Sequence, residues 1–307
     1  MSDNKKFEFL KVDDSASERI AAPNYSYWKS VFKQFLSSKV AVTLLILLVI
    51  VLGMTIIHPI ISQYDNLNTE HINNKSMHFL RPSLDYLFGT DDVGRNMFDK
   101  VWAGTNTSLY IAFVSTLITT VLGVTIGMFW GFSKRADAIM IEIYNIISNI
   151  PFTLIAMILS YALGSGVNAL IFALSCTSWI SIAYMIRVQV MIIRDREYNM
   201  ASNCLGTPIW KIIFHNILPF LVSIIMTQVS RNIPTIISYE VFLSFIGVGL
   251  GEQYASLGKI VRNTVQYLES AAYLFVIPLG IAAFISISLY VVGQKLADAS
   301  DPKTHMM

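Results

Sequence analysis

Six long apolar runs separated by polar segments dominate the chain. Each run holds 20 residues or more, enough to cross about 30 Å of hydrocarbon as an α-helix. Because an isolated span can satisfy its backbone in lipid only as a helix, the pattern predicts an all-α polytopic membrane protein with six transmembrane helices. The runs are Val40–Ile61, Thr107–Gly131, Ile139–Leu163, Val167–Ile186, Phe220–Ile246 and Ala271–Val292.

The composition agrees with this class. Hydrophobic residues make up 54% of the 307 positions and charged residues only 14%, whereas a soluble domain carries about a quarter charged residues. The net charge of +2 gives no indication of a nucleic acid partner. The two cysteines, Cys176 and Cys204, fit neither a disulfide framework nor a metal site. The first 39 residues are polar, so we expect no cleavable signal peptide.

Lysine and arginine are unequally distributed between the two sides of the expected membrane. Fifteen of the 22 lie on the side that carries both termini, six lie on the other side, and Arg231 lies within a run. This bias predicts cytoplasmic termini. The expected parts are a cytoplasmic arm (1–39) with a short interfacial helix before the first span, a transmembrane domain (40–293), a cytoplasmic tail (294–307), external segments at about 62–106 and 247–270, and a cytoplasmic loop at 187–219.

The cytoplasmic loop Arg187–Pro219 is basic and amphipathic, and it contains the small pair Ala201-Ser202 followed by Gly206. We expect two short helices that dock on a soluble motor. The small residues allow close approach, and Gly206 supplies a left-handed turn. Thr207 is expected to cap the second helix, with Pro208 at its first position. Pro219 is expected to end that helix before the fifth span. The alternative is a plain amphipathic hairpin at the membrane surface.

The first external segment contains the polar stretch Gly89–Phe98. Its glycines, its two aspartates and Arg95 predict a tight turn held by hydrogen bonds between side chains and backbone. It is either a structural turn before the second span or a direct contact with an external partner or substrate. The second external stretch, Gly247–Ser270, is rich in glycine and then amphipathic. We expect it to re-enter the outer membrane face or to lie along it.

Ionisable residues inside spans are costly, so they are functional candidates. Arg231 and Glu240 lie nine residues apart in the fifth run and face roughly opposite directions on a straight helix. Both are candidates for lining a translocation path or gate. At the start of the third run, Asp137 is expected to reach water or to pair with Lys134 or Arg135.

Known catalytic and cofactor motifs are missing from the sequence. Gly258-Lys259 is similar to the end of a phosphate-binding loop, but Gln253 replaces the first glycine and Ile260 the hydroxyl residue. The five histidines lack metal-ligand spacing, and the hydrolase motifs do not occur. We therefore expect a transport protein and not an enzyme, with no catalytic residue, no metal and no cofactor of its own.

Four motifs in the same order along the chain resemble those of one transporter family. Glu240–Gly249 matches E-x-x-L-S-F-L-G-L-G at the end of the fifth span, and Asp298–Pro302 matches a D-A-x-D-P tail. The external turn matches F-G-T-D-x-x-G-R through Gly89, Thr90, Asp91, Gly94 and Arg95. The cytoplasmic loop matches an E-A-A, glycine, L-P pattern at Met200, Ala201, Ser202, Gly206, Leu218 and Pro219, where methionine and serine replace the glutamate and the second alanine.

On these motifs the chain resembles the permease subunit of an ABC importer of the oligopeptide/dipeptide class. It is of the OppC type and is most similar to the Gram-positive Ami/Opp oligopeptide permeases. The resemblance implies the six-helix type I permease fold in a bacterial plasma membrane. It also implies a coupling role for the cytoplasmic loop. The implied partners are a second homologous permease, two ATPases that bind ATP and Mg²⁺, an extracellular peptide-binding lipoprotein, membrane lipid and the peptide substrate.

Two alternatives stay open from the sequence. One is a self-sufficient secondary transporter or channel, although no internal repeat relates the first three spans to the last three. The other is an importer of the same family for dipeptides, nickel or another small solute. The sequence does not predict peptide length or side-chain preference.

Overall fold

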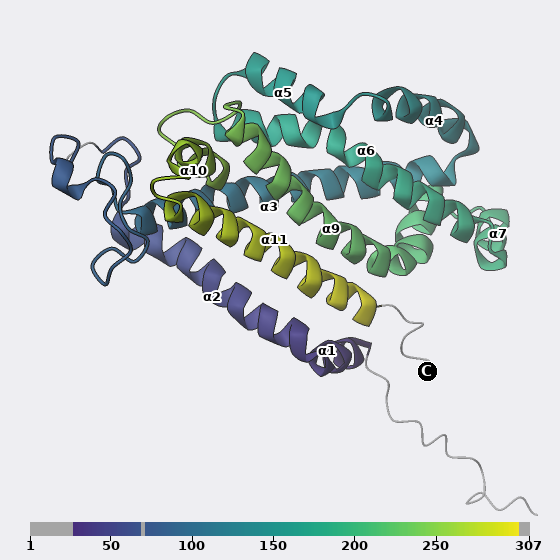
Figure 1. Ribbon diagram of the computed structural model, residues 1–307. Coiled ribbons are helices and arrows are strands. Elements are labelled where there is room, and N and C mark those ends of the chain that lie inside the picture. Colours follow the sequence, from purple (N-terminus) through teal and green to yellow (C-terminus); the bar gives the residue numbers. More distant parts are fainter. Residues whose placement is uncertain (1–26, 69–70, 301–307) are drawn as a thin grey trace, which may run out of the picture.

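The computed structural model of the protein describes residues 27–68 and 71–300 (Figure 1). Helices dominate this part, and five of them are long and apolar enough to cross a membrane. This confirms the prediction of an all-α polytopic membrane protein. The elements in chain order are α1 (Tyr27–Ser37), α2 (Lys39–Ser62), η1 (Lys75–Met77), α3 (Met97–Phe132), α4 (Lys134–Ser148), α5 (Phe152–Leu163), α6 (Val167–Arg194), α7 (Glu197–Cys204), α8 (Ile209–Lys211), η2 (Ile212–Ile217), α9 (Leu218–Phe245), α10 (Leu257–Thr264), η3 (Val265–Tyr267) and α11 (Tyr273–Ala299).

The third apolar run does not form one continuous helix. It forms the pair α4 and α5, which is bent by 81° at a short break. Pro151 explains the break, because proline lacks the N–H that a helix interior needs and disfavours helical geometry in the residue before it. Six spans are reached only if this bent pair counts as one crossing.

Glycines allow α3 and α6 to pack closely at the centre of the bundle. A Cβ atom at Gly123 would lie 2.7 Å from the Cβ of Ile182, and one at Gly131 would lie 2.6 Å from the Arg187 carbonyl oxygen. Gly127, between them, meets the backbone of Ala183 in the same way. The four-residue glycine repeat of α3 is therefore used inside the subunit, where any side chain would push the two helices apart.

Both described ends of the chain lie at the end of the bundle that carries α7 (Figure 1). In the short helix α1, Val31 and Phe35 are buried against Ala41 of α2 and Ala299 of α11. Near the end of α11, Asp298 lies 3.6 Å from Lys295. The predicted arm before residue 27 and the tail motif beyond residue 300 lie outside the described residues.

The opposite end of the bundle is closed by the segment that joins α2 to α3 and by α10 (Figure 1). Most of α10 is buried. A Cβ atom at Gly258 would lie 2.9 Å from the Ser244 Cβ on α9, and Ile260 contacts Gly104 of α3. The buried Lys259 donates to the Gly251 carbonyl at 2.7 Å. α10 therefore packs between α3 and α9, and Lys259 holds the loop that precedes it. Whether this segment re-enters the outer membrane face or lies along it stays a prediction.

Candidate functional site

The segment Arg187–Pro219 leaves the bundle at one end and carries the helix α7. Arg187 itself still belongs to α6, which continues to Arg194 before the chain turns. α7 ends at Cys204, and Gly206 forms the turn after it as predicted: its φ of +78° is a left-handed conformation that glycine adopts without strain. The first of the two expected helices is thus present, and it projects beyond the long helices (Figure 1).

The second expected helix is not separate. The chain from Ile209 to Phe245 forms a single helical stretch of 37 residues, so the prediction that Pro219 ends a short helix is wrong. The turn before this proline is a π-helix, in which the Leu218 amide donates to the Ile213 carbonyl five residues earlier. This wider turn makes room for the proline ring, which clashes with a carbonyl in a regular α-helix. The predicted threonine cap is also wrong, because Pro208 occupies the N-cap position and no side chain caps α8.

Amide side chains hold α7 against the beginning of the fifth span. Asn199 is buried and donates to the Ile193 carbonyl at the end of α6, at 3.0 Å. Asn216, in the π-helix, donates to the Asn199 side-chain oxygen at 3.1 Å and approaches the Ser202 hydroxyl at 3.4 Å. A movement of α7 is thereby linked to both α6 and α9. The contact between the two asparagines was not predicted from the sequence, since they lie 17 residues apart.

The other face of α7 and the turn after it expose large apolar side chains. Leu205 is 86% exposed, Trp210 58% and Met200 51%. Exposed apolar clusters of this kind mark interaction sites. Of the six loop positions in the family motif, Met200 and Ala201 lie on the exposed face, and Ser202 takes part in the amide contacts. Gly206 forms the turn, and Leu218 and Pro219 begin α9.

At the opposite end, Asp91 is the centre of the external turn. Its Oδ2 accepts from the Lys100 ammonium at 2.7 Å and from Arg95 Nε at 2.9 Å, and its Oδ1 accepts from the Val93 and Arg95 amides. The side chain of Asp91 is almost fully buried. Burial alone raises the pKa of this carboxyl, but the Lys100 and Arg95 charges outweigh it and hold the pKa below its ordinary value.

The neighbouring motif residues also serve the turn itself. Thr90 donates through its hydroxyl to the Met77 carbonyl at 2.6 Å. Gly89 and Gly94 have φ values of +74° and +79°, and a Cβ at Gly89 would collide with the Leu80 carbonyl. These contacts favour the structural-turn interpretation for the buried residues of the motif. The buried Lys100 was not found from sequence, because nothing local links it to Asp91.

Glu240 lies in the subunit interior, where α3, α9 and α10 meet. Its side chain is fully buried, and the Ser244 hydroxyl donates to its Oε1 at 2.8 Å. Ser108 and Ser256 also bring hydroxyl groups to the carboxyl, although Oε2 lacks a hydrogen bond of good geometry. Ser108 in turn accepts from the Leu257 amide at 3.1 Å. Glu240 is thus enclosed by its own subunit, while its role in a gate stays a prediction.

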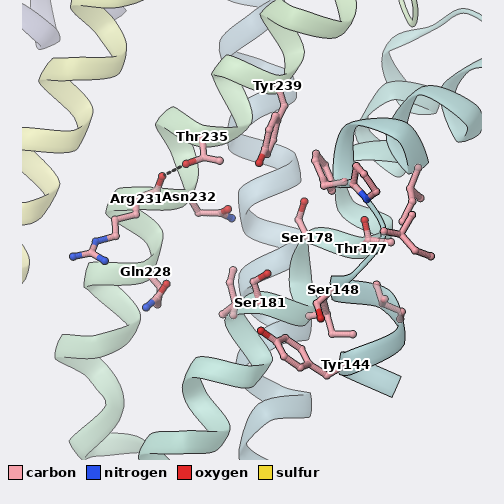
Figure 2. A pocket seen from close by; sticks show the side chains of 17 residues that line it. Tyr144, Ser148, Thr177, Ser178, Ser181, Gln228, Arg231, Asn232, Thr235 and Tyr239 are labelled. Carbon is pink, nitrogen blue, oxygen red and sulfur yellow. Dashed lines mark hydrogen bonds between the residues drawn. The ribbon is translucent and has the colours of Figure 1, made fainter. Parts of the chain in front are cut away.

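Arg231 lies on the other face of α9, at the edge of a cleft of about 540 Å³ between α9, α6 and the α4–α5 break (Figure 2). Arg231 is exposed whereas Glu240 is buried, so the two do face opposite directions as predicted. Neutral polar side chains from two helices face each other across the cleft (Figure 2). They are Gln228, Asn232, Thr235 and Tyr239 on α9 and Ser178 and Ser181 on α6.

α4, which forms one wall of this cleft, is bound by an ion pair to α6 near the end of the bundle that carries α7. Asp137, at the start of α4, forms a two-point ion pair with Arg187 on α6, in which Arg187 Nη2 lies 2.9 Å from Oδ2. Trp130 Nε1 donates to the same carboxylate at 2.8 Å. Asp137 keeps partial contact with solvent, as expected, but the predicted pairing with Lys134 or Arg135 is wrong, because its partner is Arg187. Further along α4, Tyr144 lines the cleft and stacks on Tyr184 with ring centroids 4.3 Å apart.

Comparison with known proteins identifies the family. The model of binding-protein-dependent transport system inner membrane components matches residues 123–306. The chain belongs to this family. The model of the N-terminal transmembrane domain of oligopeptide transport permease C matches residues 26–82. The chain is therefore a permease subunit of the ABC importer class, a multi-pass protein of the plasma membrane and a transport component rather than an enzyme.

Individual relatives match nearly the whole chain. The oligopeptide transport system permease protein AmiD of Streptococcus pneumoniae is 49% identical over 99% of this chain and 98% of its own length. The oligopeptide permease OppC of Bacillus subtilis is 32% identical over 97% of this chain and 96% of its own. The dipeptide permease DppC of the same species is 32% identical over 94% of this chain and 89% of its own. These matches confirm the resemblance to the Gram-positive Ami/Opp permeases.

Proposed function

We propose that this permease subunit serves an ATP-driven importer of oligopeptides and that it forms the translocation path together with a second, homologous permease. The higher identity to AmiD than to DppC favours oligopeptides over dipeptides. The polar cleft beside α9 supports a path shared between two subunits, since Arg231 and Thr235 of its lining are exposed in the single subunit. Its uncharged hydroxyl and amide groups suit the hydrogen-bonding backbone of a peptide of any sequence.

The observation that carries the proposal is the projecting helix α7 together with the exposed apolar side chains on it, after it and in α8. Leu205, Trp210 and Met200 are costly to leave in water, and an ATPase subunit docked on them would cover them. Two such ATPases, one on each permease, bind the ATP and Mg²⁺, and this chain contributes no nucleotide site. We assign the α7 end and both termini to the cytoplasm, which the excess of lysine and arginine on that side supports.

The opposite end then faces outward and receives the peptide-binding lipoprotein. The external turn and the α10 region lie side by side there: Tyr267 donates to Asp92 at 3.1 Å, and Tyr273 donates to the Leu80 carbonyl at 2.9 Å. A hollow of about 330 Å³ lies between these segments. Leu84, three residues after Arg81 of its lining, is 96% exposed. This arrangement suits a platform for a receptor that delivers peptide to the cleft.

In this mechanism, ATP binding closes the two ATPases and moves the α7 helices with them. The contact from Asn199 to Asn216 passes the movement to α9, and the path opens outward to accept peptide. Hydrolysis resets the path inward. Glu240 receives hydroxyl groups from Ser108 of α3 and from Ser256, which caps α10, and is the expected gate contact near the outer end.

The test is uptake of labelled peptides of graded length in cells that lack only this gene. Loss of uptake that returns with the wild-type gene supports the proposal, and the length profile defines the substrate. A cysteine placed at Leu205 should form a cross-link to an ATPase subunit, while one at Leu84 should form a cross-link to the receptor. Unchanged peptide uptake in the deletion strain would contradict the assignment of substrate.

A further inference from the structure

Arg231 is a charged residue without a structural role among the described residues. It lies near the middle of the 28-residue helix α9, which places it at the depth of the membrane interior. Its guanidinium is exposed, and in the described part of the chain no hydrogen bond or ion pair holds it; only its backbone carbonyl accepts from Thr235. An intramembrane arginine is costly unless it faces water, a ligand or another subunit, so its position calls for a partner.

The position of Arg231 relative to the cleft indicates where that partner lies. At about 100° per residue, Gln228, Arg231, Asn232, Thr235 and Tyr239 fall within one stripe of α9 about 100° wide. All five line the cleft. Arg231 lies at one edge of the stripe and points away from α6 (Figure 2). Its side chain is exposed in the single subunit, so a second permease that completes the path can reach it.

The charge pattern of the cleft specifies the chemistry of the ligand. Among the described residues that line it, none is acidic and Arg231 is the only charged one. Its positive charge is therefore not neutralised within the cleft. A planar guanidinium offers two parallel N–H donors that match a carboxylate, and the interaction gains strength where the surroundings exclude water.

We propose that Arg231 is an anion site in the translocation path that binds a carboxylate of the peptide during passage. This inference rests on the proposed function, because it takes the peptide as the occupant of the cleft. Two sources of carboxylate are possible, the C-terminus of the peptide and acidic side chains. Cationic peptides are repelled at the same point, so the permease adds its own charge selection to that of the receptor.

The experiment uses the complete complex in proteoliposomes, with wild-type chain or with Arg231→Gln or Arg231→Lys. Uptake is compared for a neutral peptide with a free C-terminus, its C-terminal amide, and amides with a glutamate or a glutamine inside. The acid-to-amide ratio is the uptake of the peptide with the carboxylate divided by the uptake of its uncharged partner, taken for the C-terminal pair and for the glutamate–glutamine pair. The receptor is the same for every variant, so its own preference cancels when these ratios are compared between variants. Gln228→Asn, an uncharged change in the same stripe, serves as the control, and its ratio should match the wild type whatever its overall rate.

We expect the acid-to-amide ratio of the wild type to exceed that of Arg231→Gln by roughly three- to tenfold, with Arg231→Lys between them. A shift confined to the C-terminal pair assigns the site to the C-terminus; a shift confined to the glutamate–glutamine pair assigns it to side chains. Equal ratios in wild type and Arg231→Gln overturn the inference.

If Arg231→Gln imports no peptide, the same ratio is taken from ATP hydrolysis: stimulation by the acid peptide divided by stimulation by its amide partner. Loss of stimulation by acid and amide alike overturns the carboxylate site and assigns Arg231 to the contact with the second permease. A wild-type complex that responds to none of the peptides contradicts the proposed function instead.

Discussion

Arg187, near the end of α6, holds Asp137 of α4 through two hydrogen bonds, and its guanidinium lies 5.4 Å from the centre of the Trp130 ring. This contact matters because no residue of α4 is buried in the subunit. α4 is therefore held at its beginning by one ion pair, while Tyr144 further along it forms a wall of the cleft. Seven residues after Arg187, Arg194 donates to the Gly131 carbonyl at 2.8 Å, where α6 ends before α7. The wall of the cleft is thus attached beside the coupling helix.

Breaking this ion pair should loosen α4 and weaken coupling. Asp137→Asn leaves Arg187, whose side chain is only 13% exposed, without its counter-charge. We expect a loss of about 1–3 kcal/mol in the stability of this contact and less peptide imported per ATP hydrolysed. Arg187→Lys keeps the charge but loses the two-point geometry, so it should give a smaller effect. Glu142→Gln, an exposed change on the same helix, is the control. A normal ratio of imported peptide to hydrolysed ATP in Asp137→Asn would show that this ion pair does not contribute to coupling.

The effect of a substitution at Gly206 should depend on whether the new residue accepts a left-handed backbone, and not on the size of its side chain. No atom lies within 4 Å of a Cβ at this position, yet its φ is +78°. Gly206→Val should strain the turn by more than about 1 kcal/mol and shift α7, whereas Gly206→Asn should cost less because asparagine accepts left-handed geometry. The measurement is the ratio of peptide uptake to ATP hydrolysis, with membrane insertion checked in parallel. Equal defects in both variants would mean that bulk, not conformation, decides.

The external turn should lose stability in acid. Because the pKa of Asp91 is below its ordinary value in the folded turn, its contribution is fully present above about pH 3.9, the unfolded value, and is lost as the pH falls through the folded pKa. Asp91→Asn should remove the contribution at neutral pH and leave Lys100 buried without a counter-charge, at a cost of about 3 kcal/mol. Amide hydrogen exchange of residues 79–96 reports the change.

Asp92→Asn is the matched control for the external turn, since Asp92 is only half-buried and accepts one hydrogen bond from Tyr267. Asp92→Asn should leave the amide hydrogen exchange of residues 79–96 nearly unchanged at pH 7. The difference between Asp91→Asn and wild type should be constant from pH 5 to pH 8 and should shrink only in stronger acid. A difference that already shrinks near pH 6 would contradict the lowered pKa.

Local chemistry explains which features could be predicted from the sequence. Gly206 and the Asp91 turn were predicted because the required backbone conformation and hydrogen bonds lie within a few residues. The pair of Asp137 with Arg187 was not, since 50 residues separate the two and only the packing of α4 on α6 joins them. The prediction that Pro219 ends a short helix was wrong for a related reason. A proline normally ends a helix, and a π-turn that accommodates it leaves no simple sequence signal.

Glu240 of α9 lies at the junction with α10, where Ser256 caps α10 and brings its hydroxyl to the Glu240 carboxyl. The Ser244 hydroxyl donates to its carboxyl oxygen at 2.8 Å, and no ion pair involves it among the described residues. Glu240→Gln keeps the shape and an acceptor for Ser244, so the subunit should fold and assemble. We expect altered ATPase stimulation by the loaded receptor, because the amide changes the hydrogen bonds that Ser108 and Ser256 offer to the carboxyl.

Glu240→Leu tests the same junction more severely. It removes the acceptor and leaves the hydroxyl of Ser244 in a dry site, at a cost of about 1–3 kcal/mol. Since Ser108 also holds the first amide of α10, we expect α10 to loosen and assembly to fall, measured by thermal stability of the purified complex and by protease access to residues 247–256. Ser238→Ala, at an exposed position of the same helix, is the control. If both Glu240 variants kept normal stability and normal receptor-stimulated hydrolysis, the carboxyl would be neither a gate contact nor a clamp for α10.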